Sequence, residues 1–378
     1  MTDTLSPAQT PEQTPTGRVR SVPKMVFTDA EAGALEFPSS NSRSYNYFKP
    51  QRLKATMYED VTVDVQPDPE RYLTQSWVYG FAKGPGGYPK EWTAVKSSDW
   101  HWFRDPNQEW EQTIYKNNAR IVRQVEQNIA NARSERGFER WSDSWSKIVE
   151  RHVGAWMHPE HGLGMHVFVP AQRDAPTNMI NNAISVNSMH KLRIGQDLAL
   201  FNLEASEARP AFNGRAHLEA WNDDPIWQPT RENVENLTTI RDWCEAVVAA
   251  NLAFEPLVGE LFRGGYVMAT AAANGDFITP TVMGVAESDF DRDLGYTKEL
   301  IGGLARDEQH GAHNIETIGG WLARWIEQSL AAARALEPIF TQAEHSPVTF
   351  EDTLSRARER VRETLGELDI PTPKELDQ

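Results

Sequence analysis

Asp307 and His310 form a carboxylate–histidine pair with the i, i+3 spacing that di-iron carboxylate sites use. In such a site two helices each supply a Glu-x-x-His motif and two further helices each supply one Glu. No other histidine of the chain follows a carboxylate by three residues. Since one half-motif cannot ligate two irons, we expect Asp307 and His310 to serve at a helix surface or in an inter-helix hydrogen bond, with Glu308 in the apolar stripe.

A second group of candidate ligands is a cluster of histidines at positions 152, 158, 161 and 166. Its His158-Pro159-Glu160-His161 segment has a His-x-x-His spacing that suits a divalent metal. Proline interrupts helices, and glycines follow at 162 and 164. We therefore expect a turn between two helices, with the histidines solvated or hydrogen-bonded, more than a metal site.

Other catalytic motifs are weak or missing. The sequence contains no dinucleotide-binding glycine motif, no P-loop and no nucleophile elbow. The GPGG segment at 84–87 is best explained as a turn, and Cys244 as inert packing within a helix. Asp289, Asp291 and Asp293 resemble the start of a calcium loop but lack its glycine and distal glutamate, so capping and turn roles are favoured. The chain is unconvincing as a stand-alone enzyme.

Composition excludes several classes of protein. The 378 residues contain 38 Lys and Arg against 54 Asp and Glu, a formal net charge of −16. This acidity argues against nucleic-acid binding, and no polybasic run suits an anionic membrane. A single cysteine excludes an intrachain disulfide framework, and no apolar run approaches the ~20 residues of a membrane span. The N-terminus lacks the features of a secretory signal. We expect a cytoplasmic protein.

The N-terminal part is expected to contain little regular structure. Residues 1–24 are rich in Pro, Thr, Ser and Gln and predict a disordered tail. Residues 25–104 mix short apolar runs with Pro and Gly and predict an extended, aromatic-rich arm that lies on another surface. Alternation of apolar and polar residues over 58–65 predicts one short strand in this arm.

From residue 105 onward the pattern becomes helical, with apolar residues at helix spacing and no tandem repeat. We expect a helical bundle over 105–345, followed by a C-terminal amphipathic helix and tail over 346–378. The predicted helices cover 107–136, 140–157, 175–203, 232–254, an uninterrupted pattern from about 296 to Pro338, and 348–367.

Tryptophan is abundant in this chain. Among its thirteen tryptophans, Trp92, Trp100, Trp102 and Trp110 fall within nineteen residues. Large aromatic side chains dominate both cores and interfaces. Ordinary core packing and a large partner surface are equally supported at this stage.

Five segments carry a long colinear resemblance to a known family. The chain resembles the small (β) subunits of the hydroxylase of soluble multicomponent di-iron monooxygenases, and most closely those of the systems that oxidise propane. The pattern spans nearly all of residues 25–370. The matching segments are 36–73 (EFPSSNSRSYNYFKP onward), 84–125 (GPGGYPKEWTAVKSSDWHWF onward), 175–203 (APTNMINNAISVNSMHKLRIGQDLALFNL), 274–296 (NGDFITPTVMGVAESDFDRDLGY) and 305–314 (ARDEQHGAHN).

The resemblance implies an all-α, ferritin-like bundle of long helices, similar to ribonucleotide reductase, that has lost its metal site. In the segment His190-Lys191-Leu192-Arg193-Ile194, it implies that Lys191 replaces a ligand Glu and Ile194 a ligand His. It also suggests that residues 307–310 are a degenerate copy of the second motif. On this basis the chain has no catalytic, cofactor-binding or metal-binding residues of its own.

The implied function is that of a non-catalytic scaffold for a di-iron large (α) subunit in an α2β2 hydroxylase that uses O2 and NADH on propane or another short alkane. A coupling protein and an NADH reductase would complete the system, and the arm and tryptophans would meet the large subunit. The alternatives are a self-sufficient ferritin-like di-iron protein, or a small subunit of a related monooxygenase acting on ethers, ketones or phenols.

Overall fold

The computed structural model describes residues 35–36, 44–45, 50, 55–63 and 93–377 of the chain. The predicted tail, most of the predicted arm and the GPGG segment lie outside these residues. Within the described part, no helix is both long enough and apolar enough to cross a membrane.

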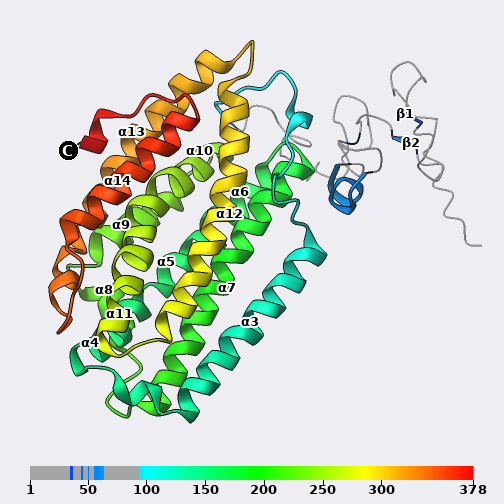
Figure 1. The fold of residues 1–378 in the computed structure, drawn as a ribbon. Coiled ribbons are helices and arrows are strands. Elements are labelled where there is room, and N and C mark those ends of the chain that lie inside the picture. Colours follow the sequence, from blue (N-terminus) through cyan, green and yellow to red (C-terminus); the bar gives the residue numbers. More distant parts are fainter. Residues whose placement is uncertain (1–34, 37–43, 46–49, 51–54, 64–92, 378) are drawn as a thin grey trace, which may run out of the picture.

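The described residues form an all-α bundle, as expected (Figure 1). Helix α3 (Glu111–Ser134) lies along one side of α7 (Asn178–Ala208), and α12 (Thr279–Ala305) also packs against α7. Helices α13 (Gly311–Ala335) and α14 (Phe350–Glu367) lie on the side of the bundle away from α3. The only strands of the described part are β1 (Leu35–Glu36) and β2 (Ser44–Tyr45), an antiparallel pair. The long helices are α3 (Glu111–Ser134), α7 (Asn178–Ala208), α12 (Thr279–Ala305), α13 (Gly311–Ala335) and α14 (Phe350–Glu367). Shorter elements are η1 (Glu59–Val63), η3 (Trp100–Trp102), η4 (Gly137–Arg140), α8 (Ala216–Asp223), α9 (Gln228–Leu237), η10 (Glu337–Thr341) and η11 (Lys374–Asp377).

Two further central helices are built from α and π segments, and the second ends in a 3-10 turn. The helix that contains η7 (Ala249–Gly259) buries every residue of that segment, so this stretch shows no clean amphipathic period. The first comprises α4 (Asp143–Ile148), η5 (Val149–Val153), α5 (Met157–Gly162), η6 (Leu163–Phe168) and α6 (Val169–Asp174). The second comprises α10 (Trp243–Val248), η7 (Ala249–Gly259), η8 (Leu261–Met268), α11 (Ala269–Ala271) and η9 (Ala272–Asn274).

The predicted turn around Pro159 is wrong, because Pro159 lies inside the first of these helices. It is the third residue of α5, and the residues before it are already helical, so the helix continues through a position that lacks a backbone N–H. The glycines that follow do not loosen the helix but allow close packing, since a Cβ on Gly164 would lie 2.8 Å from the Leu192 side chain. The predicted helix 232–254 is likewise wrong in its bounds: α9 ends inside it at Leu237, residues 238–242 separate α9 from α10, and the helix that begins at α10 continues through Pro256.

The uninterrupted helix predicted from 296 to 338 is two helices. Residues 306–310 separate α12 from α13. The Asp307 carboxylate accepts hydrogen bonds from the backbone N–H groups of Gln309 and His310, at 2.9 and 3.0 Å, and so stabilises a turn. Side-chain capping of this kind competes with continuation of a helix. Asp307 and His310 therefore do not share a helical face.

The strand predicted at 58–65 is also wrong where the structure describes it, because Glu59–Val63 are helical. The backbone N–H of Thr56 donates to the Glu59 carboxylate at 2.9 Å, and the backbone N–H of Glu59 donates to the Thr56 hydroxyl at 3.2 Å. This reciprocal capping box starts a helix, and it outweighs the alternating pattern.

The tryptophan side chains of the described residues pack in or against the hydrophobic core. All eleven tryptophans in the described residues are buried or packed against the core. Trp100 meets Trp243 edge to face, with ring centroids 5.8 Å apart. Trp102 lies against Gly303 of α12. The described end of the arm therefore packs onto its own bundle.

Replacing Gly303 with alanine is expected to lower the free energy of unfolding by about 1–3 kcal/mol, because the new Cβ would overlap the Trp102 ring. Gly320→Ala is the matched control: it lies on α13 with no atom near its Cβ position, so alanine there should stabilise by up to about 1 kcal/mol. Urea unfolding of both variants measures the difference. Equal stabilities would show that Trp102 does not pack as described.

Candidate functional site: a buried ion network at the centre of the bundle

Five charged side chains meet at the centre of the four central helices. Glu160 comes from α5, Lys191 from α7, Glu255 from η7, Arg263 from η8 and Glu287 from α12. The side chains of Glu160, Glu255 and Arg263 are fully buried, and Lys191 is 4% exposed. Charged groups are almost never buried to this degree without partners.

Two cations join the three carboxylates. The Lys191 Nζ lies 2.7 Å from Glu255 Oε1 and 3.4 Å from Glu160 Oε2. The Arg263 guanidinium donates to Glu255 at 2.7 Å, to Glu160 at 3.1 Å and to Glu287 at 2.6 Å. The network is therefore continuous across all four helices.

The electrostatics keep both cations charged. Burial disfavours the ammonium of Lys191, but the carboxylates of Glu160 and Glu255 outweigh burial and raise the pKa of Lys191. Burial also opposes ionisation of Glu255, yet Arg263 and Lys191 lower its pKa below the ordinary value. At Glu287, burial prevails and raises the pKa despite the attraction of Arg263.

A di-iron ligand set takes inward-facing residues from four helices of a bundle. This network also draws on four helices, but its residue types differ. On α7, Lys191 is followed three residues later by Ile194, and on α12, Glu287 is followed by Phe290; Ile194 and Phe290 are both buried. Where a ligand set needs Glu-x-x-His twice, this chain thus has a cation and two hydrocarbon side chains. A protonated lysine, an isoleucine and a phenylalanine cannot coordinate iron. The residues present do not fit a di-iron centre.

The sequence resemblance pointed to two segments as degenerate iron-ligand motifs. The first, which contains Lys191 and Ile194, lies at the centre of the bundle. Residues 307–310, which the resemblance suggested as a degenerate second motif, lie at the α12–α13 junction and not at the bundle centre. The i, i+3 pair of α12 that begins at the bundle centre is Glu287 and Phe290. Within the described residues, no group of three or more His, Cys, Asp or Glu side chains is arranged to hold a metal ion.

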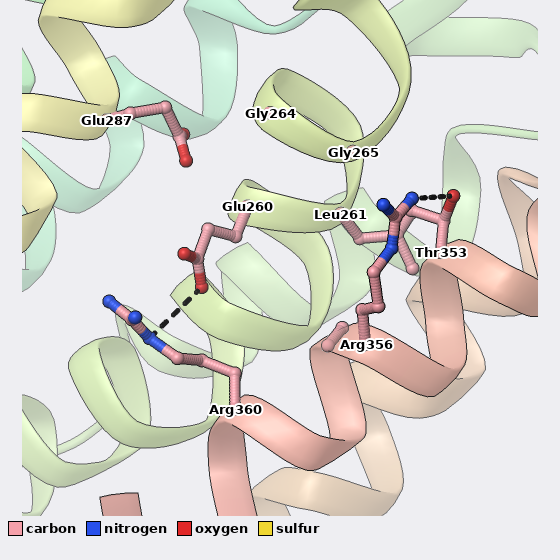
Figure 2. Close-up of a pocket in the computed structure, with 9 residues that line it drawn as sticks. Glu260, Leu261, Gly264, Gly265, Glu287, Thr353, Arg356 and Arg360 are labelled. Carbon is pink, nitrogen blue, oxygen red and sulfur yellow. Dashed lines mark hydrogen bonds and ion pairs between the residues drawn. The ribbon is translucent and has the colours of Figure 1, made fainter. Parts of the chain in front are cut away.

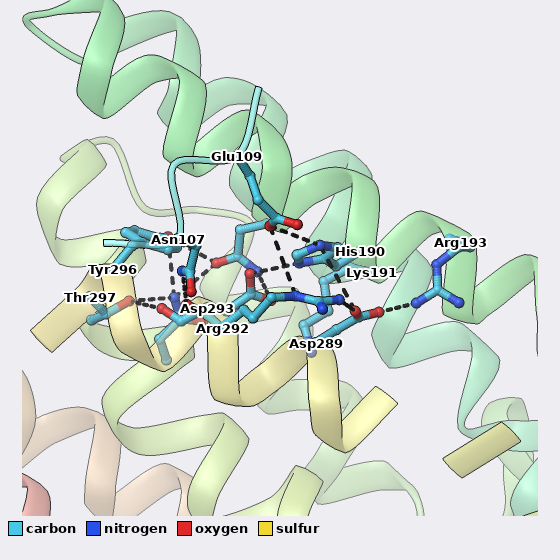
Figure 3. Close-up of polar contacts among 12 residues, drawn as sticks. Asn107, Glu109, His190, Lys191, Arg193, Asp289, Arg292, Asp293, Tyr296 and Thr297 are labelled. Carbon is cyan, nitrogen blue, oxygen red and sulfur yellow. Dashed lines mark hydrogen bonds and ion pairs between the residues drawn. The ribbon is translucent and has the colours of Figure 1, made fainter. Parts of the chain in front are cut away.

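A second buried polar cluster lies between α7, α12 and the segment that leads into α3 (Figure 3). The His190 Nδ1 lies 2.8 Å from Asp293, and its Nε2 lies 3.7 Å from Glu109. Burial opposes protonation of His190, but Asp293 outweighs it and raises the pKa of His190. Arg193 pairs with Asp289. This cluster fastens the start of the bundle to its centre.

These contacts correct the expectation for the three aspartates at 289, 291 and 293. All three lie inside α12 rather than in a cap or turn. Asp289 and Asp293 are buried in the second cluster, while Asp291 pairs with Arg360 at the surface, at 3.0 Å.

Of the four predicted histidines, His161 and His166 lie close together, with ring centroids 5.9 Å apart, and His152 has other partners. His152 is buried, accepts a hydrogen bond from the Trp227 indole at 2.9 Å and lies 3.0 Å from the Gln342 amide oxygen. His158 stacks on His217, with ring nitrogens 3.3 Å apart. The other two predicted members, at 161 and 166, are exposed. These hydrogen-bonded and exposed side chains agree with the expectation that the histidines are hydrogen-bonded or solvated.

Cys244 is fully buried, as expected, and burial raises the pKa of its thiol well above the ordinary value. Such a thiol is not reactive.

A pocket lies between η8 and α14 (Figure 2), at the edge of the ion network. Its walls carry Glu260, Glu287, Arg356 and Arg360, and Glu260 lies 3.8 Å from Arg360. Burial raises the pKa of Glu260 to about 7. The Glu287 side chain is 20% exposed, so this end of the network is its most exposed part.

Comparison with known proteins identifies the class. The family model described as methane/phenol/alkene hydroxylase matches residues 77–308, and the chain belongs to this family. It is 55% identical over 359 residues, covering 95% of this chain and 98% of the relative, to a propane 2-monooxygenase hydroxylase component small subunit from Rhodococcus jostii. It is 24% identical, over 90% of this chain and 89% of the relative, to a methane monooxygenase component A beta chain from Methylosinus trichosporium.

Solved structures agree on the fold. A phenol hydroxylase from Pseudomonas sp. OX1 superposes with a TM-score of 0.71 at 21% identity, covering 84% of this chain and 92% of that chain. The family resemblance seen in the sequence and the ferritin-like fold that it implied are both confirmed.

Proposed function

We propose that this chain is the non-catalytic small subunit of the hydroxylase of a multicomponent monooxygenase, and that it scaffolds a di-iron large subunit. The observation that carries the proposal is the centre of the bundle, where Lys191 and Arg263 stand among the carboxylates and hydrocarbon side chains take the place of histidines. No residue of this chain would contact oxygen or the substrate, so its contribution is binding and support of the partner.

Propane or another short alkane is the proposed substrate of the assembly, with O2 and NADH as co-substrates. The support is 55% identity to small subunits of propane 2-monooxygenases over nearly the full length of both chains, in Rhodococcus jostii and in Gordonia. We further propose an α2β2 hydroxylase in the cytoplasm that works with a coupling protein and an NADH reductase. Ethers, ketones and phenols are the competing substrates.

Co-expression with the large subunit tests this function. We expect the two chains to purify as a heterotetramer with about two irons per large subunit, and this chain alone to contain none, because its central carboxylates are already neutralised. Native mass and iron content per chain give the answer. A solitary chain that carries two irons and oxidises propane would contradict the proposal and favour a self-sufficient di-iron protein.

A further inference from the structure

Two glutamates bridge the two cations of the ion network. Glu160 offers Oε2 to Lys191 and Oε1 to Arg263, at 3.4 and 3.1 Å. Glu255 offers Oε1 to Lys191 and Oε2 to Arg263, both at 2.7 Å. Each carboxylate thus contacts one cation with each oxygen, as bridging carboxylates do between two metal ions.

The surrounding residues hold this arrangement in place. The Trp156 indole donates to Glu160 Oε1 at 2.7 Å, and the Arg263 guanidinium lies over the Trp156 ring, 5.5 Å from its centroid. Gly259 makes room for the pair, since a Cβ there would lie 2.7 Å from both the Arg263 Nη1 and the Glu255 Oε2. The cations therefore occupy a site shaped for them.

Charge balance explains why cations are needed. Glu160 and Glu255 would bring two negative charges into the fully buried centre of the bundle, where unpaired charge is strongly unfavourable, while the third carboxylate, Glu287, is 20% exposed. Lys191 and Arg263 supply two positive charges. We propose that the Lys191 ammonium and the Arg263 guanidinium take the place of two metal ions, neutralising and bridging the carboxylates so that the four helices hold together without metal.

The inference predicts a specific behaviour for a variant without the lysine. Lys191→Ala would leave Glu160 and Glu255 facing a space with an excess of negative charge, which suits a divalent cation with oxygen ligands. In this variant a divalent metal ion from the solution should therefore bind where the lysine ammonium was. The stability of the variant should then respond to metal, which the parent chain does not require.

Thermal unfolding of the purified full-length chain, in EDTA and in excess Mn2+, tests the inference. We expect the parent chain to have the same Tm in both buffers. Lys191→Ala should unfold roughly 5–10 °C lower in EDTA and regain at least half of that loss in Mn2+. Lys298→Ala is the matched control, since it removes a lysine from a solvent-exposed pair with Glu367, at 2.7 Å, and should respond to neither change.

Several results would overturn the inference. These are a rise in the Tm of the parent chain with Mn2+, a Lys191→Ala Tm equal to that of Lys298→Ala, or a Lys191→Ala Tm that ignores Mn2+. If Lys191→Ala does not fold, Lys191→Met is compared with the double variant Lys191→Met/Glu255→Gln, which removes one charge of each sign. The double variant should be the more stable; if it is not, charge neutralisation is not the role of Lys191.

Discussion

Arg263→Met is expected to lower the free energy of unfolding by about 3–5 kcal/mol, the range seen when one partner of a buried ion pair is removed. The methionine would nearly fill the volume of the lost side chain, so the loss would report charge rather than a cavity. Glu160 and Glu255 would keep only Lys191 as a cationic partner, and Glu287 would lose its ion pair at 2.6 Å. Urea unfolding, followed by circular dichroism, measures the change.

Arg324→Met is the control for this prediction. Arg324 also pairs with a glutamate, Glu245, but its side chain is 55% exposed. Solvent-exposed pairs contribute about 0–1 kcal/mol, so this variant should lose little. Similar losses in the two variants would mean that the buried network does not stabilise the bundle through its charges.

Acidification from pH 7 to pH 5 is expected to remove about 2 kcal/mol of stability through His152 alone. Burial lowers the pKa of His152 to about 4, and Gln342 only partly offsets this. Its Nδ1 accepts the Trp227 N–H, so a proton cannot be added there without breaking that bond. Between pH 6.5 and 4 the unfolded chain therefore binds a proton that the folded chain excludes, and stability falls as the pH falls.

His152→Gln tests this by comparison with the parent chain at both pH values. The variant should be less stable at pH 7, but its loss on acidification should be smaller than that of the parent by about 2 kcal/mol. The comparison is necessary because other groups titrate in this range: burial raises the pKa of Glu260 to about 7, an effect of opposite sign. His345→Gln, at an exposed position, should retain the parental pH dependence, and an unchanged dependence in His152→Gln would contradict the assignment.

The elements that the sequence predicts well are those with a clear apolar period or a clean end. Helices α3 and α14 lie close to the predicted ranges because each exposes one polar side, and α7 does so because its sequence begins after Pro176 and contains no helix breaker. The predictions fail at Asp307 and Thr56, where a single side chain caps the backbone, and at Pro159, where the helix tolerates a proline that usually marks its end. These outcomes depend on local hydrogen bonds that periodicity does not record.

The candidate site shows the same limit. The family resemblance located Lys191 and Ile194, because a lysine in place of a ligand glutamate changes the charge. Glu160, Glu255 and Arg263 were not found, since a single charged residue within a helix looks the same whether it faces solvent or the core. A sequence signal did exist: η7 is apolar on every side except for Asn251 and Glu255, and a carboxylate in such surroundings implies a buried cation.

The ion network also sets a condition on how the chain folds. Its members come from four helices that are distant in the sequence. Each charged side chain has all of its ion-pair partners only when all four helices have docked. A collapsed intermediate containing only α5, η7 and η8 would bury two glutamates and Arg263 without Lys191. Such a species is unfavourable, so the four helices are expected to dock in one concerted late step. Premature, partly ordered states of this chain would then be short-lived during synthesis.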